Sequence, residues 1–490
     1  MTARTSLGLV AAVGALASAA LMAACGDDGT TSTGSTSSNG STTSSAGGGT
    51  TNGSGGAGGG AATNGSGGGG GVDPFAGPVK SLTEVDLGTG DLGQYVFFQI
   101  PDRTVGFTVL GETTDAGPFG LNRLRAPSTT SVISGYAIPG TGLTAFVDEN
   151  VISAQDPQSD LPDAWPVAEG KWLIALGGDG PTSGHARLFV RRTEDGVFHG
   201  GAVDINVFMS PGSGAGQSYV NAMLSKLFGT YYTPKIGLSL GNVAYFTVPS
   251  SYDDVSTYAE YRTLLSSSAG IGSAPALNLF VIGSMSGELD GALGIAGGIP
   301  GSPMVHGTPR SGVAYTPTGN TDYDASVLAH EVGHLAGLFH TSEYQVSAFD
   351  PLADTPECPN IMNTNPSNCP DVSNVMFPIA YGGNVMTAWQ ARVMQGSALY
   401  RGALTEGGAF SEPLPTPILP NAAQPSSGVA TSFELGEVAV RAPASPIEAA
   451  LTGHWCAPSP GIASALAAEL DDATKATVAS LALDPGAFDV

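Results

Sequence analysis

The stretch HEVGHLAGLFH occupies residues 330–340 and matches the spacing H-E-x-x-H-x-x-G-x-x-H without a mismatch. The chain has only 7 His in 490 residues, so the chance that composition alone produces this pattern is on the order of one in 100,000. A helix here would place His330 and His334 on one face, one turn apart. Gly337 can adopt a left-handed conformation that ends the helix and folds the chain back toward His340. The pattern therefore predicts three imidazoles around one point.

Three neutral imidazoles can bind Zn²⁺ and leave the fourth tetrahedral position open for water, which is typical of a catalytic zinc site. Zinc lowers the pKa of a water molecule in that position. Glu331 directly follows the first histidine, so it would lie beside the metal without binding it. There it could accept the proton of a water that attacks a carbonyl. We predict zinc held by His330, His334 and His340, with Glu331 as the catalytic base.

This ligand pattern resembles that of the metzincin zinc metalloproteases. Metzincins also carry a methionine turn below the metal, and two candidates follow the motif: NVMFP at residues 374–378 and NVMT at residues 384–387. We assign the Met-turn to Met376, because Pro378 suits a tight turn. Met386 instead precedes TAWQ, a sequence that predicts a capping box at the start of a helix. The resemblance implies a zinc endopeptidase that hydrolyses peptide bonds.

Within the metzincins, the chain most resembles the pappalysin group. The features it shares with that group are, in chain order, Gly337-Leu338, Asp354-Thr355-Pro356, Met376 and Thr387 to Gln390. Pro378 stands where several other metzincins have a tyrosine, and Tyr381 is our candidate for that transition-state donor. The resemblance extends over roughly residues 203–400.

The residues around the motif predict a mixed sheet with helices, the catalytic domain, which we place at residues 201–410. Three segments have the composition of strands: residues 203–208, 243–248 and 277–282. Three segments have helical periodicity: residues 218–228, 255–265 and 326–336. Residues 294–300, followed by 313–315, are predicted to form the edge strand and its approach. The resemblance implies that a protein or peptide substrate pairs with this edge strand as an extra strand.

Residues 76–200 alternate between apolar and polar side chains in short runs, such as 94–100 and 170–176, punctuated by Gly and Pro. This pattern predicts an all-β sandwich before the catalytic domain, and the fold class is therefore α+β. The two runs faintly resemble strands of bacterial pre-peptidase domains, a resemblance that assigns no catalytic residue. Substrate binding, inhibition before activation and structural support all remain open for this domain.

Residues 1–25 resemble a bacterial lipoprotein signal peptide, because an apolar stretch at 7–22 leads into LMAACG, with Cys25 as the lipidation site. An ordinary secretion signal cleaved nearby is the alternative, and it also leads to export. Residues 26–75 consist mostly of Gly, Ser, Thr, Asn and Ala and predict a flexible linker. We expect an exported lipoprotein of a bacterial envelope, anchored to the outer membrane or cell surface or released extracellularly.

The other three cysteines lie in the second half of the chain. Cys358 and Cys369 belong to the loop between the third histidine and the turn methionine, and an exported protein would join them as a disulfide. A structural zinc site is a poor alternative, because no C-x-x-C spacing or adjacent His accompanies them. Cys456 remains open as a free thiol, an intermolecular bridge or a latency ligand to zinc. The chain ends in a predicted Pro-rich linker at 411–445 and a predicted helical tail at 446–490.

The composition excludes one class of partner. The chain has 17 Lys and Arg against 42 Asp and Glu, a formal net charge of −25, so nucleic acid is not an expected partner. Asp350, Asp354 and Asn363 offer oxygen atoms on one irregular loop and are candidate calcium ligands, with ordinary solvated side chains as the alternative.

Two functions remain open for this chain. The first is an active zinc endopeptidase that is tethered to the bacterial envelope and hydrolyses extracellular proteins. The second is a catalytically silent, protease-derived binding or adhesion module. Glu331 favours the first, because a binding module has no need of a general base beside the metal.

Overall fold

The structure is a computed structural model of the chain. It describes residues 73–139, 141, 143–147, 150–272, 274–343, 348–359, 361 and 365–411. The predicted signal peptide with Cys25, most of the predicted linker, Asn363, Cys456 and the two predicted segments beyond residue 411 lie outside the described residues. No helix within these described ranges combines the length and the apolar character needed to cross a membrane.

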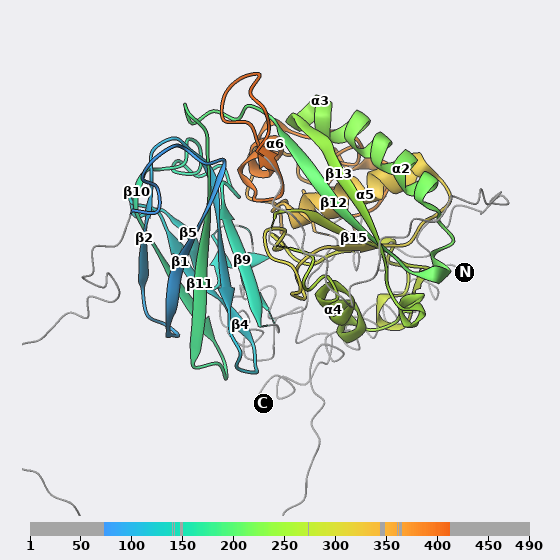
Figure 1. Cartoon of the computed structure of the whole chain (residues 1–490), viewed down its shortest axis with the longest axis horizontal. Coiled ribbons are helices and arrows are strands. Elements are labelled where there is room, and N and C mark those ends of the chain that lie inside the picture. Colours follow the sequence, from blue (N-terminus) through green and yellow to red (C-terminus); the bar gives the residue numbers. More distant parts are fainter. Residues whose placement is uncertain are drawn as a thin grey trace, which may run out of the picture. The chain divides into compact units, whose positions relative to one another are not determined.

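The N-terminal β region, residues 73–200, consists of two antiparallel sheets (Figure 1). Its strands are β1 (Leu82–Asp91), β2 (Val96–Ile100), β3 (Thr104–Glu112), β4 (Phe119–Arg125), β5 (Ser131–Ser134), β6 (Ala137–Ile138), β7 (Leu143–Thr144), β8 (Phe146–Val147), β9 (Val151–Asp156), β10 (Gly170–Gly178) and β11 (Ser183–Arg192). The first sheet has the order β1-β11-β3-β9. The second has the order β2-β10-β4-β5-β6-β7, with β8 paired to β4.

Both sheets of this region contribute to one hydrophobic core. Phe107 from the first sheet and Trp172 from the second meet edge to face, with 4.8 Å between their ring centroids. β3 and β9 are buried along almost their whole length, so both faces of these two strands are covered. One face meets this core, and the other packs against residues C-terminal to the β region.

The C-terminal region, residues 201–411, is built on a mixed sheet of the order β13-β12-β15-β18-β17, with β19 paired to β12. Its strands are β12 (Gly201–Met209), β13 (Leu238–Thr247), β15 (Leu277–Val281), β17 (Gly294–Ala296), β18 (Val313–Tyr315) and β19 (Arg401–Gly402), and a separate pair is formed by β14 (Asp254–Val255) and β16 (Ser284–Met285). The strands from β13 to β18 run parallel, whereas β17 is antiparallel and lies at the edge. The fold as a whole is mixed α+β.

Helices cover both faces of this mixed sheet. The helices of the C-terminal region are η1 (Pro211–Ser213), α2 (Gln217–Lys226), the π-helix η2 (Leu227–Tyr232), α3 (Thr233–Ile236), η3 (Ser250–Tyr252), α4 (Tyr258–Ser266), η4 (Gly287–Leu289), α5 (Thr321–Leu335), η6 (Pro366–Asn368) and α6 (Ala388–Gly396). Leu279 of β15 points into the core shared with α2 and α5. Phe280, its neighbour, points into the core shared with α4. This alternation explains why every residue of β15 is buried.

The predicted strands overlap β12, β13 and β15, and the predicted helices overlap α2, α4 and α5, but two helix starts differ from the prediction. α5 begins at Thr321 rather than at residue 326, because the side chain of Asn320 accepts the first free N–H groups of the helix. α4 begins at Tyr258 rather than at residue 255, because Thr257 forms a capping box with Glu260. The predicted capping box at the start of α6 is confirmed.

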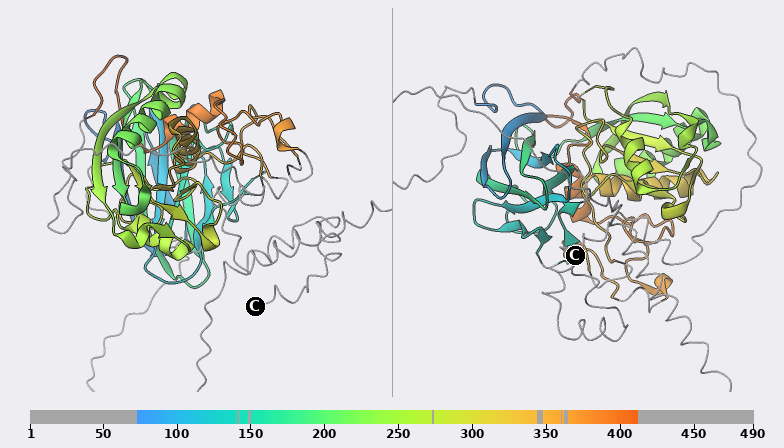
Figure 2. Two further views of the ribbon diagram at one scale, coloured as in Figure 1. Left: turned by 90° about the vertical axis from the view of Figure 1, so that its right-hand side faces the viewer. Right: turned by 90° about the horizontal axis from the view of Figure 1, so that it is seen from below.

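The two regions are joined by a buried arginine. Arg191 of β11 is 2% exposed, and its guanidinium donates to the carbonyls of Ser397 (2.7 Å) and Tyr400 (2.8 Å). It also stacks on the Tyr400 ring, 3.6 Å from the centroid. The segment that follows α6 is thereby fixed against the first sheet (Figure 2). Hydrogen bonds satisfy this buried guanidinium, as its desolvation requires.

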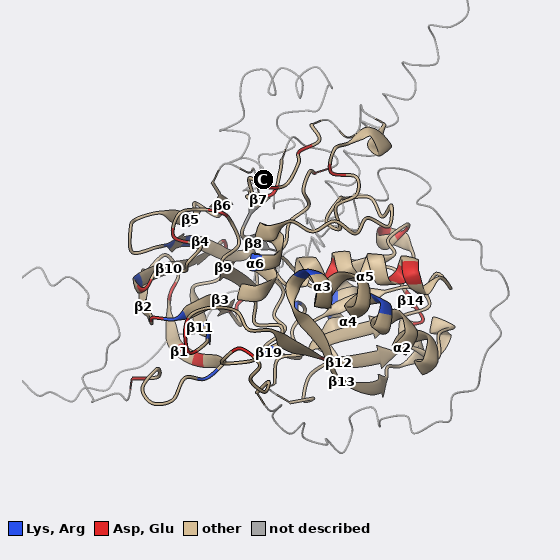
Figure 3. Ribbon diagram, turned by 90° about the horizontal axis from the view of Figure 1, so that it is seen from above, with Lys and Arg blue, Asp and Glu red and all other residues tan. Residues whose placement is uncertain are grey.

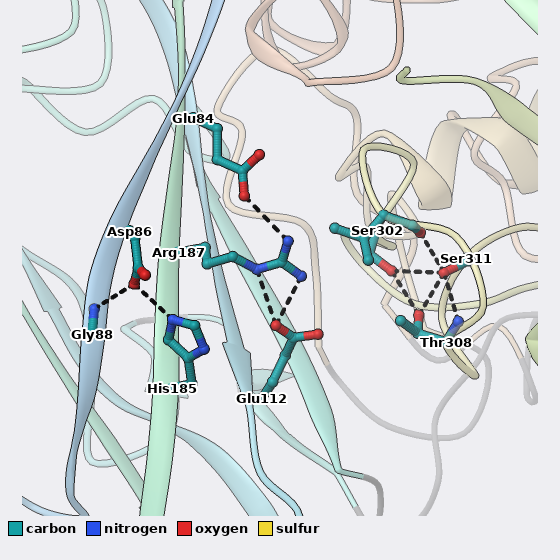
Figure 4. Close-up of polar contacts among 10 residues, drawn as sticks. Glu84, Asp86, Gly88, Glu112, His185, Arg187, Ser302, Thr308 and Ser311 are labelled. Atoms are coloured by element: carbon teal, nitrogen blue, oxygen red, sulfur yellow. Dashed lines mark hydrogen bonds and ion pairs between the residues drawn. The ribbon is translucent and has the colours of Figure 1, made fainter. Parts of the chain in front are cut away.

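Charged side chains are sparse in both regions and include the acidic first turn of α5 (Figure 3). On β11, Arg187 bonds Glu84 of β1 at 3.2 Å and Glu112 of β3 at 2.8 Å (Figure 4). Such partly exposed pairs contribute only about 0–1 kcal/mol each. These ion pairs connect β1, β11 and β3 side by side but contribute little to the stability of the sheet.

Hydroxyl groups fix the loop between β17 and β18. Ser302 and Thr308 are 3.0 Å apart at their side-chain oxygens, and Thr308 and Ser311 are 2.5 Å apart (Figure 4). All three side chains are buried, so their mutual hydrogen bonds replace those lost to water. The loop leads directly into β18 and holds the approach to the edge strand in place.

Candidate metal centre

A glycine turn at the end of α5 brings the three histidines of the motif together. His330 and His334 lie one turn apart near the C-terminal end of the helix. Gly337 has φ +104°, which favours glycine, and its N–H donates to the His334 carbonyl at 2.8 Å. The N–H of Leu338 donates to the Gly333 carbonyl at 2.9 Å, and the two hydrogen bonds together form a Schellman motif. The chain reverses there and returns His340 to the helix end.

The three Nε2 atoms of these histidines converge. They are 3.1 Å apart between His330 and His334, 3.2 Å between His330 and His340, and 3.2 Å between His334 and His340. Zn–N bonds of about 2.0–2.1 Å in a tetrahedral site correspond to about 3.3 Å between ligand nitrogens. The spacing therefore fits a tetrahedral zinc.

The opposite ring nitrogen of each histidine faces a hydrogen-bond acceptor. The Nδ1 of His330 lies 2.8 Å from the Val375 carbonyl, and the Nδ1 of His334 lies 2.7 Å from the Leu338 carbonyl. The Nδ1 of His340 lies 3.1 Å from a carboxylate oxygen of Glu343. Each acceptor places the proton on Nδ1 and leaves the Nε2 lone pair free to bind a metal.

The centre is buried, and burial favours the neutral form of His330 that a metal requires. His330 is 8% exposed, and His334 and His340 are 0% and 1% exposed. Burial and the proximity of His340 lower the pKa of His330 to about 3. A neutral imidazole is the ligand form of histidine. Within the described residues, these three side chains form one of two groups that could hold a metal ion.

Glu331 lies beside the three histidines but belongs to a different environment. Its side chain is 1% exposed, and burial raises its pKa well above the ordinary value, although a hydrogen bond from the Ala296 backbone opposes the shift. Ala296 belongs to β17, so Glu331 lies next to the edge strand. Its Oε2 has no hydrogen-bond partner among the described residues. A buried oxygen left free in this way suits a group that exchanges protons with a ligand.

Met376 lies below the helix that carries the ligands. It is fully buried, and a Cβ placed at Gly333 would lie 2.5 Å from the Met376 sulfur. Any side chain at Gly333 would therefore displace this methionine. Met386 is only partly buried and packs against the same core. The two NVM segments are paired, since the N–H of Val375 donates to the Val385 carbonyl at 2.8 Å.

The disulfide predicted between Cys358 and Cys369 is confirmed. These cysteines and Asp371 make up the second metal-compatible group, but here the two sulfurs are bonded to each other. Asp371 accepts hydrogen bonds from Thr341 (2.6 Å) and Ser342 (2.8 Å), the two residues that follow His340. The crosslinked loop is therefore connected to the third ligand through buried side chains.

The remaining candidate residues are dispersed. Tyr381 is 52% exposed and stacks on Phe377 with 6.1 Å between centroids, and its role as a donor stays a prediction. Asp350 accepts a hydrogen bond from Thr355 at 2.5 Å, and burial raises its pKa to about 8. Asp354 accepts the N–H of Trp389 at 3.0 Å. Calcium binding also stays a prediction.

Sequence reasoning missed the carboxylate that orients the third ligand. Glu343 stands three residues after His340, and a partner for the free Nδ1 could have been sought at such short range. It also missed Gln155, whose amide reaches the end of α5 from 181 residues away. The sequence contains no signal for a contact of that kind.

No protein-family model matches the sequence, and no curated protein matches it. Similar solved structures include metalloproteinase-II from Bacteroides fragilis, with a TM-score of 0.21, 13% identity and coverage of 34% of this chain and 57% of that chain. A Bacillus subtilis protein has a TM-score of 0.12, 11% identity and coverages of 41% and 44%. A family two carbohydrate esterase from Cellvibrio japonicus has a TM-score of 0.09, 11% identity and coverages of 34% and 52%. The chain thus spans just over half the length of the Bacteroides metalloproteinase.

Proposed function

We propose that the chain is a zinc-dependent endopeptidase of the metzincin type, closest to the pappalysin group, with Met376 as its Met-turn. His330, His334 and His340 would hold the zinc, and Glu331 would be the catalytic base. One observation carries this proposal. Three Nε2 atoms lie within 3.2 Å of one another, each with its Nδ1 against an acceptor, and a buried carboxylate with a free oxygen lies next to them.

Glu331 performs the proton transfers in this proposal. Bound zinc supplies Lewis acidity, which lowers the pKa of water and polarises the scissile carbonyl. Glu331 accepts a proton from the attacking water at its free Oε2 and delivers it to the leaving amine nitrogen as the C–N bond breaks. The Glu331 carboxyl group would hold that proton between the two transfers.

The edge strand supplies the binding surface for an extended peptide. Within the described residues β17 pairs only with β18, and we propose that an extended peptide pairs with its other side. A backbone hydrogen bond joins Ala296 of β17 to Glu331, which supports a position of the proposed base next to this strand. A protein substrate would therefore be bound through its backbone, next to the group that activates water.

Replacement of Glu331 by Gln tests the mechanism. The amide preserves shape and leaves the three imidazoles in place, so the variant should retain zinc and fold but lose at least about 100-fold in peptide hydrolysis. Zinc content and cleavage of a broad peptide library are the measurements. Glu357→Gln, at an exposed position just before Cys358, is the matched control and should cleave like the wild type.

Two outcomes would change the proposal. Equal cleavage by the wild type and Glu331→Gln would assign the activity to other residues. Full zinc content with no cleavage by the wild type would favour the alternative, a catalytically silent binding or adhesion module on the bacterial envelope.

We also propose that the chain is exported and anchored by a lipid at Cys25, on the basis of the LMAACG sequence at residues 21–26. Growth with a labelled fatty acid should mark the wild type and leave Cys25→Ser unlabelled. Equal labelling of both would contradict the anchor and leave the metal centre unaffected.

A further inference from the structure

Two glutamines of the N-terminal β region reach the turn between the second and third histidines. Gln155, at the end of β9, is 1% exposed, and its Nε2 donates to the Ala336 carbonyl at 2.8 Å. The same atom is 3.1 Å from the Val393 carbonyl of α6 and 3.3 Å from the Pro157 carbonyl. Three surrounding carbonyl oxygens identify this atom as the amide nitrogen. One side chain thus joins the ends of α5 and α6.

Gln158 extends this contact to the next residue of the turn. Its side chain is 5% exposed, and its Nε2 donates to the Gly337 carbonyl at 3.1 Å, with the Ile299 carbonyl at 3.5 Å. A Cβ placed at Gly337 would collide with the amide of Gln155. Gly337 is therefore required by its left-handed backbone and by the glutamine packed against it.

Phe339 anchors the same turn through apolar contact. It immediately precedes the third ligand, yet it belongs to the hydrophobic core between the two N-terminal sheets, together with Trp172. Its side chain is 3% exposed. The residues on both sides of Leu338 are consequently held by the β region, through the Gly337 carbonyl and the Phe339 ring.

Helix ends explain why these contacts matter. The last carbonyls of an α-helix have no partner within the helix and must bond to water, to caps or to other side chains. Ala336 and Gly337 are buried, so their carbonyls depend on donors from the protein. Gln155 and Gln158 supply those donors from outside the C-terminal region.

We propose that the N-terminal β region completes the metal centre, with Gln155 and Gln158 as positioning residues. They hold the turn at Ala336 and Gly337 so that His340 arrives preorganised beside His330 and His334. The β region is then a structural part of the site, the role that the sequence left open between substrate binding, inhibition and support. This inference rests on the metal binding in the proposed function and is independent of proteolysis.

Replacement of the two glutamines by Met, singly and together, tests the proposal in the full chain. Methionine keeps the length of the side chain and removes the donor. Zinc affinity is measured by competition with a chelator, and the ligand geometry is followed by the absorption spectrum of the Co²⁺-loaded protein. Loss of groups that support metal ligands typically weakens metal binding 10–100-fold. We expect about tenfold weaker zinc binding in Gln155→Met and an altered Co²⁺ spectrum.

Two controls separate positioning from general stability. Gln99→Met, on β2 of the other sheet, removes an amide that bonds only the neighbouring Ile100 carbonyl and should bind zinc like the wild type. Ile174→Val removes a methyl group from the core that receives Phe339. It should lower the melting temperature without changing zinc affinity. If Gln155→Met does not fold, Gln158→Met tests the same turn through one hydrogen bond.

Three results would overturn the inference. One is wild-type zinc affinity and an unchanged Co²⁺ spectrum in a folded glutamine variant. Another is an equal loss of zinc affinity in Ile174→Val, which would show that the glutamines affect zinc binding only through the general stability of the fold. The third is an equal loss in Gln99→Met. A wild-type chain that binds no zinc would instead overturn the proposed function.

Discussion

The two regions of the chain use histidine in opposite ways. In the N-terminal β region, the Nε2 of His185 lies 2.7 Å from Asp86 and the Nε2 of His199 lies 2.8 Å from Asp195, each in a pair at the surface. In the C-terminal region, His330, His334 and His340 turn Nε2 toward one another and leave Nδ1 to the acceptors. The two kinds of histidine therefore differ in two respects. In the candidate metal centre, Nδ1 is the nitrogen that faces the hydrogen-bond acceptor, and the three Nε2 atoms converge on one point.

Replacement of a histidine by Ala in each region gives the largest expected difference. His334→Ala removes one of three ligands from a fully buried site, and we expect a loss of more than about 100-fold in zinc affinity, beyond the cost of losing a supporting group. His185→Ala should bind zinc like the wild type, because it removes only a surface pair. Metal analysis after equilibration with zinc is the measurement. Equal zinc content in the two variants would contradict the assignment of the site.

The regions also differ in covalent crosslinking, since all the cysteines in the described residues lie in the C-terminal region. The Cys358–Cys369 disulfide closes a short loop with a sequence separation of 11. On the chain-entropy model, its removal in Cys358→Ser/Cys369→Ser should lower the free energy of unfolding by about 3 kcal/mol.

Urea denaturation of that double variant is the test, with Ser367→Ala in the same loop as the control. Ser367 is exposed and bonds the nearby Asn365, so its loss should change stability by less than about 0.5 kcal/mol. A double variant as stable as the wild type would show that the loop is held by its packing alone.

Both regions bury carboxyl groups that have a free oxygen, and Glu331 and Asp156 belong to different settings. Glu331 adjoins the metal centre, whereas neither oxygen of Asp156 in β9 has a partner among the described residues. Burial, and to a lesser extent the charge of Asp163, raises the pKa of Asp156 well above its ordinary value. A group whose pKa is higher in the folded state stabilises the fold at low pH and loses this contribution as pH rises through the folded pKa.

The smallest expected effect is a change in pH dependence. The free energy of unfolding of the wild type should fall between pH 5 and pH 9 through Asp156, whose pKa is raised by burial in the folded state, and Asp156→Asn should remove that part of the fall. Urea midpoints at the two pH values are the measurement. Asp179→Asn, an exposed position, should keep the wild-type slope. An unchanged slope in Asp156→Asn would mean that this carboxyl group does not titrate differently on folding.

Local sequence rules account for the parts of the site that are close together in the chain. The i,i+4 spacing of His330 and His334 and the glycine at position 337 determine two ligands and the turn toward the third, because helix geometry and a left-handed φ act over a few residues. The predicted start of α5 at residue 326 is too late, and the signal for the true start at Thr321 is also local. Asn320 is itself a local capping signal that lay upstream of the predicted start.

Some choices between local alternatives required packing. NVM occurs twice, at Met376 and Met386, and only contact with Gly333 distinguishes the buried sulfur below the helix. Pro378 and the capping box after Met386 favoured Met376 from the sequence, but its contact with Gly333 depends on how the loop folds over many residues.

The sequence by itself determined the three histidines that converge, the carboxyl group that follows the first of them, the disulfide and the α+β class, since each follows from residue type and short spacing. Tertiary structure alone decided what supports them: Glu343 at His340, and Gln155, Gln158 and the core around Phe339 at the ligand turn. The two glutamines belong to the N-terminal β region, and no sequence pattern indicates which distant carbonyl a buried amide will bond. Side-chain hydrogen bonds between remote segments exist only after both regions have packed, so they can be seen only in the folded chain.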